Sequence, residues 1–306
     1  MSNSNTKPIL VTGSHRSGST WTGRMLALSS NIAYIHEPFN LEHRRGICKA
    51  EFRYWFPYIC DENEHLYLRY IYNCLHFRYN ILEEFRDTEL LKDLFRLLRD
   101  YIRFKKYKIL KKRPLVKDPI AVFSAGWLAK RFNMDVVVLI RHPAAFAGSL
   151  KKARWNHPFD HFLQQPLLMQ HYLMKYKSEI EEYSKREKDT VDQAILLWNL
   201  IHHMILKYRE NHPDWIFIKH KELSESPIEE FGKLYNKLGI SFSMDIQRKI
   251  KVFSFAGPEK DNSDKLRRDS KSNIWSWKTR LTGEEIQRVK EKTHGIARAF
   301  YTEEDW

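Results

Sequence analysis

The feature that most constrains this chain is an apolar run that leads directly into a glycine-rich loop. Residues 8–11 read PILV, and the loop from Gly13 to Thr20 reads GSHRSGST. Four residues separate Gly13 from Gly18, which is the spacing of a phosphate-binding loop, and residues 20–30 can form the helix that follows. Backbone N–H groups in such a loop, with the positive end of a helix dipole behind them, bind anions. The order of strand, loop and helix therefore predicts an anion site near the start of the sequence.

The loop lacks the lysine that nucleotidases carry. Ser19 stands at that position, and Arg16 is the only cation inside the loop. A guanidinium is a planar fork of donors that can hold oxygens of a phosphate or sulfuryl group. A serine and glycine turn that merely caps an ordinary helix is the alternative. The strand, the arginine and the Ser19–Thr20 pair in register favour the anion site.

Strands and helices alternate along the rest of the chain. Further strands are expected at residues 31–35, 114–119, 135–140 and 215–219, and helices at 85–112, 121–132, 191–209 and 227–238. This alternation predicts an α/β fold, a P-loop-type parallel sheet flanked by helices, with ligands at the carboxyl ends of the strands. A length of 306 residues suits a single domain. We expect a helical insertion at about residues 41–113 and a separate closing segment at about residues 256–306.

A second strand end carries an arginine. The strand at residues 135–140 runs into Arg141, Pro143 is placed to start a helix, and Ser149 lies about two turns into it. An aspartate at this strand end would be a magnesium ligand in a P-loop nucleotidase, and Arg141 cannot serve as one. Together with the loop that lacks lysine, this argues against a magnesium-dependent nucleotidase.

The overall charge limits the class of partner. The 52 lysines and arginines against 38 aspartates and glutamates give a net charge of +14, which implies an anionic partner. The basic residues are spread along the chain and match no zinc-finger, RNP or basic-zipper pattern, so nucleic acid is not the expected partner. Cys48, Cys60 and Cys74 form no disulfide framework or zinc motif. No signal peptide and no apolar run that could cross a bilayer is found, so we expect a cytoplasmic protein without a transmembrane segment.

Two motifs carry a resemblance to a known family. The segment SHRSGSTW at residues 14–21 resembles the 5′-phosphosulfate motif of sulfotransferases that use 3′-phosphoadenosine-5′-phosphosulfate (PAPS). The segment from Arg141-His-Pro to Ser149 resembles their 3′-phosphate motif. Arginine at position 16 is similar to the carbohydrate and bacterial branches, whereas the cytosolic aryl and steroid enzymes have lysine there. The RKGxxG segment of those enzymes is absent; KLRRDS at residues 265–270 and WSWK at 275–278 stand in its place.

The resemblance implies a sulfotransferase that moves the sulfuryl group of PAPS to an acceptor hydroxyl, with PAP as the product and no metal. Arg16 would then follow the charge that grows on the leaving oxygen. The residues implied in cofactor binding are Ser14, His15, Arg16, Ser17, Gly18, Ser19, Thr20, Trp21, Arg141, Ser149, Arg267, Arg268 and Ser270.

The general base is expected at the end of the strand at residues 31–35. By resemblance to the EP segment of carbohydrate sulfotransferases, Glu37 would take the proton, helped if partial burial raises its pKa. His36 is the alternative, and because side chains alternate along a strand, only one of the two should face the site. Glu37 could instead cap a turn or pair with an arginine. Lys117 could contact the sulfate or the acceptor and Asp118 could orient Arg16 or Lys117, unless the two form an ordinary salt-bridged turn.

The acceptor is expected to be a saccharide or glycoconjugate hydroxyl. The basic side chains at positions 43–45 and at Arg53 suggest that this acceptor is an acidic glycan. The aromatic residues at 52–58 could stack on a sugar or pack the insertion. Two rival classes stay open. A P-loop kinase would require Mg-ATP, and a non-catalytic basic protein would bind anionic lipid or nucleic acid, with the basic helix at residues 85–112 as its contact.

Overall fold

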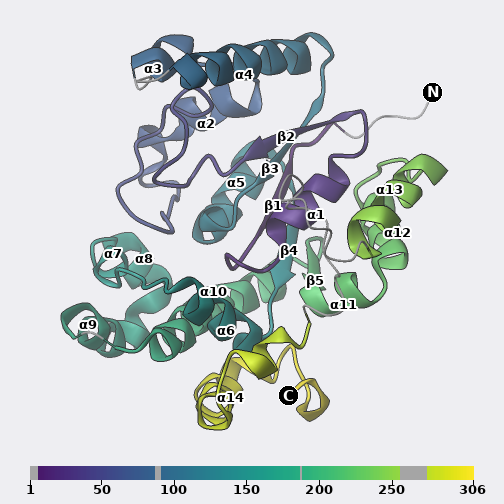
Figure 1. Ribbon diagram of the computed structural model, residues 1–306. Helices are drawn as coiled ribbons and strands as arrows, with labels where there is room; N and C mark the ends of the chain where they lie inside the picture. Colours follow the sequence, from purple (N-terminus) through teal and green to yellow (C-terminus); the bar gives the residue numbers. More distant parts are fainter. Residues whose placement is uncertain (1–5, 87–90, 187, 256–273) are drawn as a thin grey trace.

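A computed structural model of the chain describes residues 6–86, 91–186, 188–255 and 274–306. Its centre is a five-stranded sheet with the order β2-β3-β1-β4-β5, in which every pair of neighbours is parallel (Figure 1). The strands are β1 Ile9–Gly13, β2 Ile32–His36, β3 Arg113–Lys117, β4 Asp135–Ile140 and β5 Ile216–Lys219. Each strand expected from the sequence is present to within a few residues, and the predicted α/β fold class is confirmed.

The strands form because their apolar side chains are buried on both faces of the sheet. In β4, Val136 and Val138 belong to one hydrophobic core, and Val137 and Leu139 belong to a second core on the other face. Side chains alternate between the two faces of a strand, so an unbroken valine and leucine run serves both cores. This places the strand ends, and the loops that follow them, on a rigid support.

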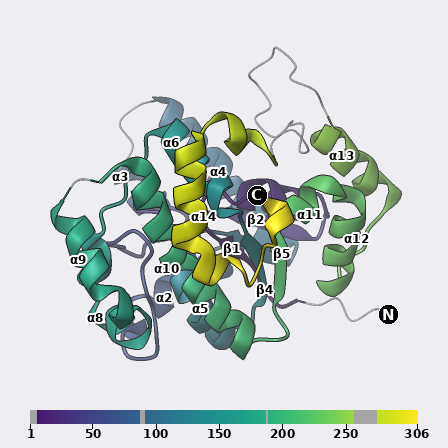
Figure 2. The same cartoon turned by 90° about the horizontal axis from the view of Figure 1, so that it is seen from below.

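Helices cover both faces of the sheet. They include α1 Ser19–Leu26, α5 Ala125–Phe132, α6 Pro143–Ala153, α10 Thr190–Asn211, α11 His220–Glu225, α12 Pro227–Lys237, α13 Met244–Phe255 and α14 Gly283–Ala297. The helices α6 and α10 contribute to the first core, for example through Phe146 and Trp198. Met25 of α1 and Phe231 of α12 contribute to the second core. Figure 2 shows α14 lying across α6 and α10, which it contacts.

The segment between β2 and β3, where a helical insertion was expected, is largely helical and is called the insertion below. It contains a 3₁₀ turn Glu64–Leu66 and the helices α2 Leu68–Leu75, α3 Ile81–Arg86 and α4 Leu91–Ile109. The sequence predicted one helix over residues 85–112, whereas the structure has a separate short helix α3 before α4. Arg44 holds these elements together, because its guanidinium pairs with Glu84 of α3 and Asp100 of α4. Both helices lie at the end of the molecule opposite α14 (Figure 1).

The remaining elements are short. After α6 come α7 Asp160–Leu163, α8 Pro166–Leu168, a π-helical turn Met169–Leu173, a 3₁₀ turn Met174–Tyr176 and α9 Lys177–Lys185. Near the end of the chain, 3₁₀ turns Ser276–Thr279 and Glu303–Asp305 flank α14. Across the described ranges, none of the helices combines the length and the apolar character needed to cross a membrane.

Candidate active site

A cavity of about 1090 Å³ opens where the strands end. Arg16 after β1, Glu37 after β2, Arg141 after β4 and His220 after β5 all line it. These residues are far apart in the sequence and meet only because the parallel strands end at one edge of the sheet. The cavity therefore lies at the sheet edge where the sequence predicted a ligand site, and its use as a binding site stays a prediction.

The glycine-rich loop has the backbone of an anion cradle. Arg16 has φ 62° and Gly18 has φ 89°, both in the left-handed region. Gly18 is the N-cap of α1, and no side chain caps that helix, so the first N–H groups of α1 have no acceptor within the helix. A Cβ atom on Gly18 would lie 2.6 Å from Cδ2 of His220. Glycine is required here both by its φ angle and by the closeness of the His220 ring.

The predicted loop residues divide into two groups. The residues that line the cavity are His15, Arg16, Gly18, Ser19, Thr20 and Trp21. Ser14 and Ser17 are fully buried, do not line it, and have hydroxyls without a hydrogen-bond partner among the described residues. An anion in the cavity would therefore meet the backbone of the loop and the side chains of the first group, and the two buried serines would lie beneath it.

One contact joins the two motifs found in the sequence. The Nε atom of Arg16 donates a hydrogen bond to Oγ of Ser149 on α6, over 2.9 Å. The guanidinium carbon of Arg16 also lies 5.4 Å from the ring centroid of Trp155. Arg141, at the end of β4, is only 7% exposed and lines the same cavity. The glycine-rich loop and the Arg141 to Ser149 segment thus form one site.

Glu37 is held as a carboxylate by two neighbours. One oxygen pairs with Nζ of Lys117, and the other accepts a hydrogen bond from Nδ2 of Asn40 over 3.0 Å. Partial burial acts to raise the pKa of Glu37, but the charge and hydrogen bond of Lys117, with that of Asn40, outweigh burial and lower the pKa. The raised pKa that would have helped Glu37 as a base is therefore not found, because the net shift is downward. Glu37 is ionised at neutral pH.

His36 and Glu37 both line the cavity, although strand alternation predicted that only one would. The reason is that β2 ends at His36, and Glu37 has a left-handed backbone with φ 43°. Nδ1 of His36 lies 3.2 Å from the hydroxyl of Tyr34. Burial, followed by the charge of Lys117, lowers the pKa of His36 to about 4. The His36 imidazole is neutral at neutral pH, so the cavity wall offers two proton acceptors.

Lys117 and Asp118 lie behind the cavity wall. The Lys117 side chain is fully buried, does not line the cavity and contacts Glu37, so the salt-bridged alternative describes it better than direct contact with a substrate. Asp118 accepts hydrogen bonds from the backbone N–H groups of Phe39, over 2.6 Å, and Ile120, over 2.9 Å. Burial raises the pKa of Asp118 to about 7. These bonds show that Asp118 fixes the turn after β2, while its charge also acts on the neighbouring Lys117.

Sequence reasoning missed several residues of the cavity wall, which are Arg24, Trp155, His157, His220, Ser224, Phe253 and Arg280. His220 directly follows β5, so the strand-end rule that identified Arg141 would have identified it as well. Arg280 belongs to the expected closing segment and packs beside Gly148 of α6, where an added Cβ would lie 3.4 Å from its Cβ. Arg267, Arg268 and Ser270, the other residues expected in that segment, lie outside the described residues.

The aromatic stretch at residues 52–58 is divided between the cavity wall and the core of the insertion. Trp55 and Phe56 line the cavity. Phe52 packs inside the insertion, with its ring 4.7 Å from that of Phe39 and 5.5 Å from that of Tyr67. One part of the stretch therefore faces the cavity and another part anchors the insertion to the turn after β2, whereas stacking on a sugar stays a prediction.

The basic residues taken to indicate an acidic glycan are not at the site. None of His43, Arg44, Arg45 and Arg53 lines the cavity. Arg44 forms ion pairs with Glu84 and Asp100, and Arg45 lies 3.8 Å from Glu51. The charge of Arg44 is used within the insertion, and because none of the four residues lines the cavity, they give no reason to expect an acidic acceptor.

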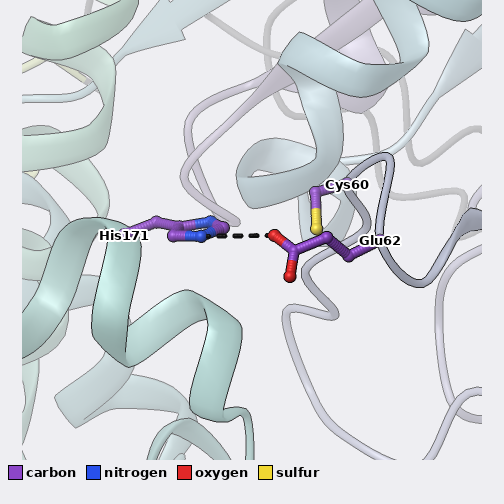
Figure 3. A group of neighbouring side chains, drawn as sticks. All are labelled: Cys60, Glu62 and His171. Atoms are coloured by element: carbon purple, nitrogen blue, oxygen red, sulfur yellow. Dashed lines mark ion pairs between the residues drawn. The ribbon is translucent and has the colours of Figure 1, made fainter.

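One group in the described part of the chain has side chains placed as metal ligands. Cys60, Glu62 and His171 bring their ligand atoms within 4.8 Å of one another (Figure 3). Nε2 of His171 lies 3.5 Å from a carboxylate oxygen of Glu62. None of the three lines the cavity. Transfer without a metal, as the sequence suggested, stays a prediction.

Comparison with known proteins agrees with this site. A family model described as "Sulfotransferase family" matches residues 8–178, a range that contains both motifs. The fold is similar to a sulfotransferase domain from the Synechococcus PCC 7002 olefin synthase, with 16% identity, 99% of this chain and 98% of that chain covered, and a TM-score of 0.53. It is also similar to a sulfotransferase domain from the curacin biosynthetic pathway, with 15% identity, 94% and 97% covered, and a TM-score of 0.51. No curated protein matches the chain. With more than half of its length matched and both motifs at one cavity, the chain belongs to the sulfotransferase family.

Proposed function

We propose that this sulfotransferase uses PAPS as its donor and transfers the sulfuryl group to a hydroxyl of a carbohydrate or glycoconjugate. The observation that carries the proposal is the 2.9 Å hydrogen bond between Arg16 and Ser149, because it unites the motif for the 5′-phosphosulfate with the motif for the 3′-phosphate. PAPS, when bound, supplies the sulfuryl group and leaves as PAP. All other chemistry is assigned to the side chains of the cavity.

The donor groups of the cavity suit a nucleotide with charge at both ends. Two glutamates line the cavity, Glu37 and Glu42. Four arginines also line it, and these are Arg16, Arg24, Arg141 and Arg280. Arg141 and Ser149 would hold the 3′-phosphate. The loop N–H groups, Ser19 and Thr20 would hold the 5′ end. Among the residues that the structure describes, the cavity wall has no cluster of metal ligands, and a cavity with this arginine content can neutralise an anionic donor without a divalent ion.

We assign the proton transfer to Glu37. Its lowered pKa keeps it ionised, and Lys117 with Asn40 fixes its carboxylate at the cavity wall. Lys117 is accordingly a positioning residue, and Arg16 is the cation that stabilises charge on the leaving oxygen. His36 is the second candidate for the base, since its imidazole is neutral and lines the same cavity.

The wall beyond Arg16 supports a saccharide acceptor. Trp55 and Trp155 line the cavity together with the polar side chains of Asn156 and Glu42. Aromatic faces beside a few polar groups are a common arrangement for a ligand that has both C–H faces and hydroxyls. The three cysteines are free, which supports the further proposal of a reducing, cytoplasmic location.

Labelled PAPS offered with a panel of saccharides and simple alcohols, in EDTA, tests the proposal. We expect label in a saccharide product and almost none with the Glu37→Gln variant. Transfer to simple alcohols alone would exclude the carbohydrate acceptor. Transfer of phosphate from Mg-ATP, with no transfer from PAPS, would overturn the proposal as a whole and favour a kinase.

A further inference from the structure

The helix α4 has apolar side chains on two opposite faces. Leu97 and Phe104, seven residues apart, are each 1% exposed and form the face that packs against the insertion. A second apolar stripe runs along the other face at spacings of three, four and seven residues, and it consists of Phe95, Leu98, Ile102 and Ile109, which are 74%, 44%, 64% and 75% exposed. At 100° per residue, the two stripes lie on roughly opposite sides of the helix. Packing within the chain explains the inner stripe only.

Basic side chains flank the exposed stripe. Between residues 93 and 112 there are eight lysines and arginines and two aspartates. Asp93 pairs with Arg96, and the buried Asp100 pairs with Arg44, Arg99 and Arg103. At 100° per residue, Lys105 and Lys106 lie on the two sides of the exposed stripe, and Lys108 and Lys111 lie near the end of the helix. All four are exposed and have no acidic partner among the residues that the structure describes. The surface is therefore both apolar and positively charged.

We propose that this outer face of α4 binds the surface of an anionic lipid bilayer. The stripe from Phe95 to Ile109 is about 21 Å long at 1.5 Å per residue, and α4 lies at one extremity of the molecule, where a flat surface can reach it (Figure 1). Apolar side chains would enter the interfacial region while the lysines beside them meet anionic headgroups. The neighbouring helix α3 also has two exposed apolar side chains, Leu82 and Phe85.

An anionic bilayer would explain both the exposed apolar side chains and the positive charge of this face of α4. A partner that is only anionic would explain the charge alone. A nucleic acid would bind the lysines and leave Phe95 and Ile102 in water. A bilayer has an apolar interior beside its charged surface, so the same contact buries the stripe and neutralises the lysines. The predicted binding therefore depends on both kinds of side chain, and this dual dependence can be measured.

Vesicle co-sedimentation of the full chain tests the proposal. The probes are vesicles of phosphatidylcholine alone and vesicles with about 30% phosphatidylglycerol, a charge density at which basic segments are attracted to the surface. The variants are Phe95→Ser with Ile102→Ser, and Lys106→Glu with Lys108→Glu. Matched controls away from α4, on α12 and α13, are Met244→Ser with Val252→Ser, and Lys237→Glu with Lys251→Glu, all at exposed positions (Figure 1).

We expect the native chain and both controls to bind the anionic vesicles and to bind neutral vesicles much more weakly. Each α4 variant should lose on the order of tenfold in vesicle affinity. Equal binding by native chain and α4 variants, or absence of binding, would overturn the proposal. So would self-association that the Phe95 and Ile102 changes abolish without any vesicle binding. Binding to nucleic acid that depends on Lys106 and Lys108 but not on Phe95 would overturn it equally. The thermal midpoint of each variant confirms that it is folded.

Discussion

Two regions of this molecule are basic, and their charges are used in different ways. At the carboxyl edge of the sheet the cations are few and held in place: Arg16 bonds Ser149, and Lys117 is fully buried against Glu37. On α4 the cations are many and exposed, and Lys106 and Lys108 have no acidic partner in the described residues. The net charge of +14 therefore combines two basic regions that suit different kinds of partner. The first region fits a small ligand with defined anionic groups, and the second fits an extended surface.

This comparison predicts that, of the substitutions considered, a change at Arg16 has the largest effect on turnover. We expect Arg16→Ala to lower turnover by about 10³ to 10⁵, the scale on which an arginine stabilises transition-state charge in related transfers. Much of the PAP affinity should remain, because the main contribution of Arg16 comes only in the transition state. Arg16→Lys should retain part of the activity. Steady-state kinetics with PAP titration measures both, and unchanged turnover in the alanine variant would remove Arg16 from the mechanism.

The second largest effect on turnover is expected from substitution of the general base, Glu37. Glu37→Gln is expected to lower the turnover number by about 10² to 10⁴, the usual range for general-base catalysis, with PAP binding intact. His36→Ala should lower it much less. A glutamine also leaves Lys117 without its partner, so the thermal midpoint of the variant must be compared with that of the native chain. If His36→Ala proves the more damaging change, the base is His36.

A smaller effect is expected on the pH profile. Lys117 lowers the pKa of Glu37, so Lys117→Met should raise that pKa and move the acid limb of kcat/KM to higher pH. The sign follows because Glu37 accepts a proton only above its pKa. Lys117 also lowers the pKa of His36, so the shift is measured again in the His36→Ala background. An acid limb that stays in place there would show that Glu37 is not the titrating group.

The smallest effect is expected from α4. Lys106→Glu with Lys108→Glu should leave kcat/KM for a freely dissolved acceptor within about twofold, because exposed charges far from the site are largely screened. The control is the same assay with the Arg16→Ala variant. A large loss of activity in the α4 variant would show that the α4 lysines contribute to catalysis, and would contradict the assignment of separate roles to the two basic regions.

The residues at the carboxyl edge of the sheet could be predicted because each follows a strand that short stretches of sequence identify. The apolar runs defined the strands, and the residues that follow a parallel strand share one edge, which located Arg16, Glu37 and Arg141. The same rule would have located His220 after β5. Arg280 could not be located this way, since it reaches the cavity through the packing of distant segments.

Two details at the end of β2 had no signal in the sequence. Nothing indicated the left-handed backbone of Glu37, which comes before a proline, and this conformation places both Glu37 and His36 at the cavity. The partnership of Glu37 with Lys117 depends on the pairing of β2 with β3, which sequence order alone does not specify. The insertion was equally hard to predict in detail, because Arg44, Glu84 and Asp100 become partners only after folding.

Calorimetric titration with PAP, ADP and ATP tests the central claim, that the sheet edge is a site for PAPS. If Arg141 and Ser149 hold the 3′-phosphate, two charge-assisted hydrogen bonds of about 1.5 to 3 kcal/mol each favour PAP over ADP. This corresponds to a preference of roughly a hundredfold or more. The preference should persist in EDTA, weaken in Arg141→Lys and collapse in Arg141→Ala. Binding of ATP as tight as that of PAP, or binding that needs magnesium, would contradict the account.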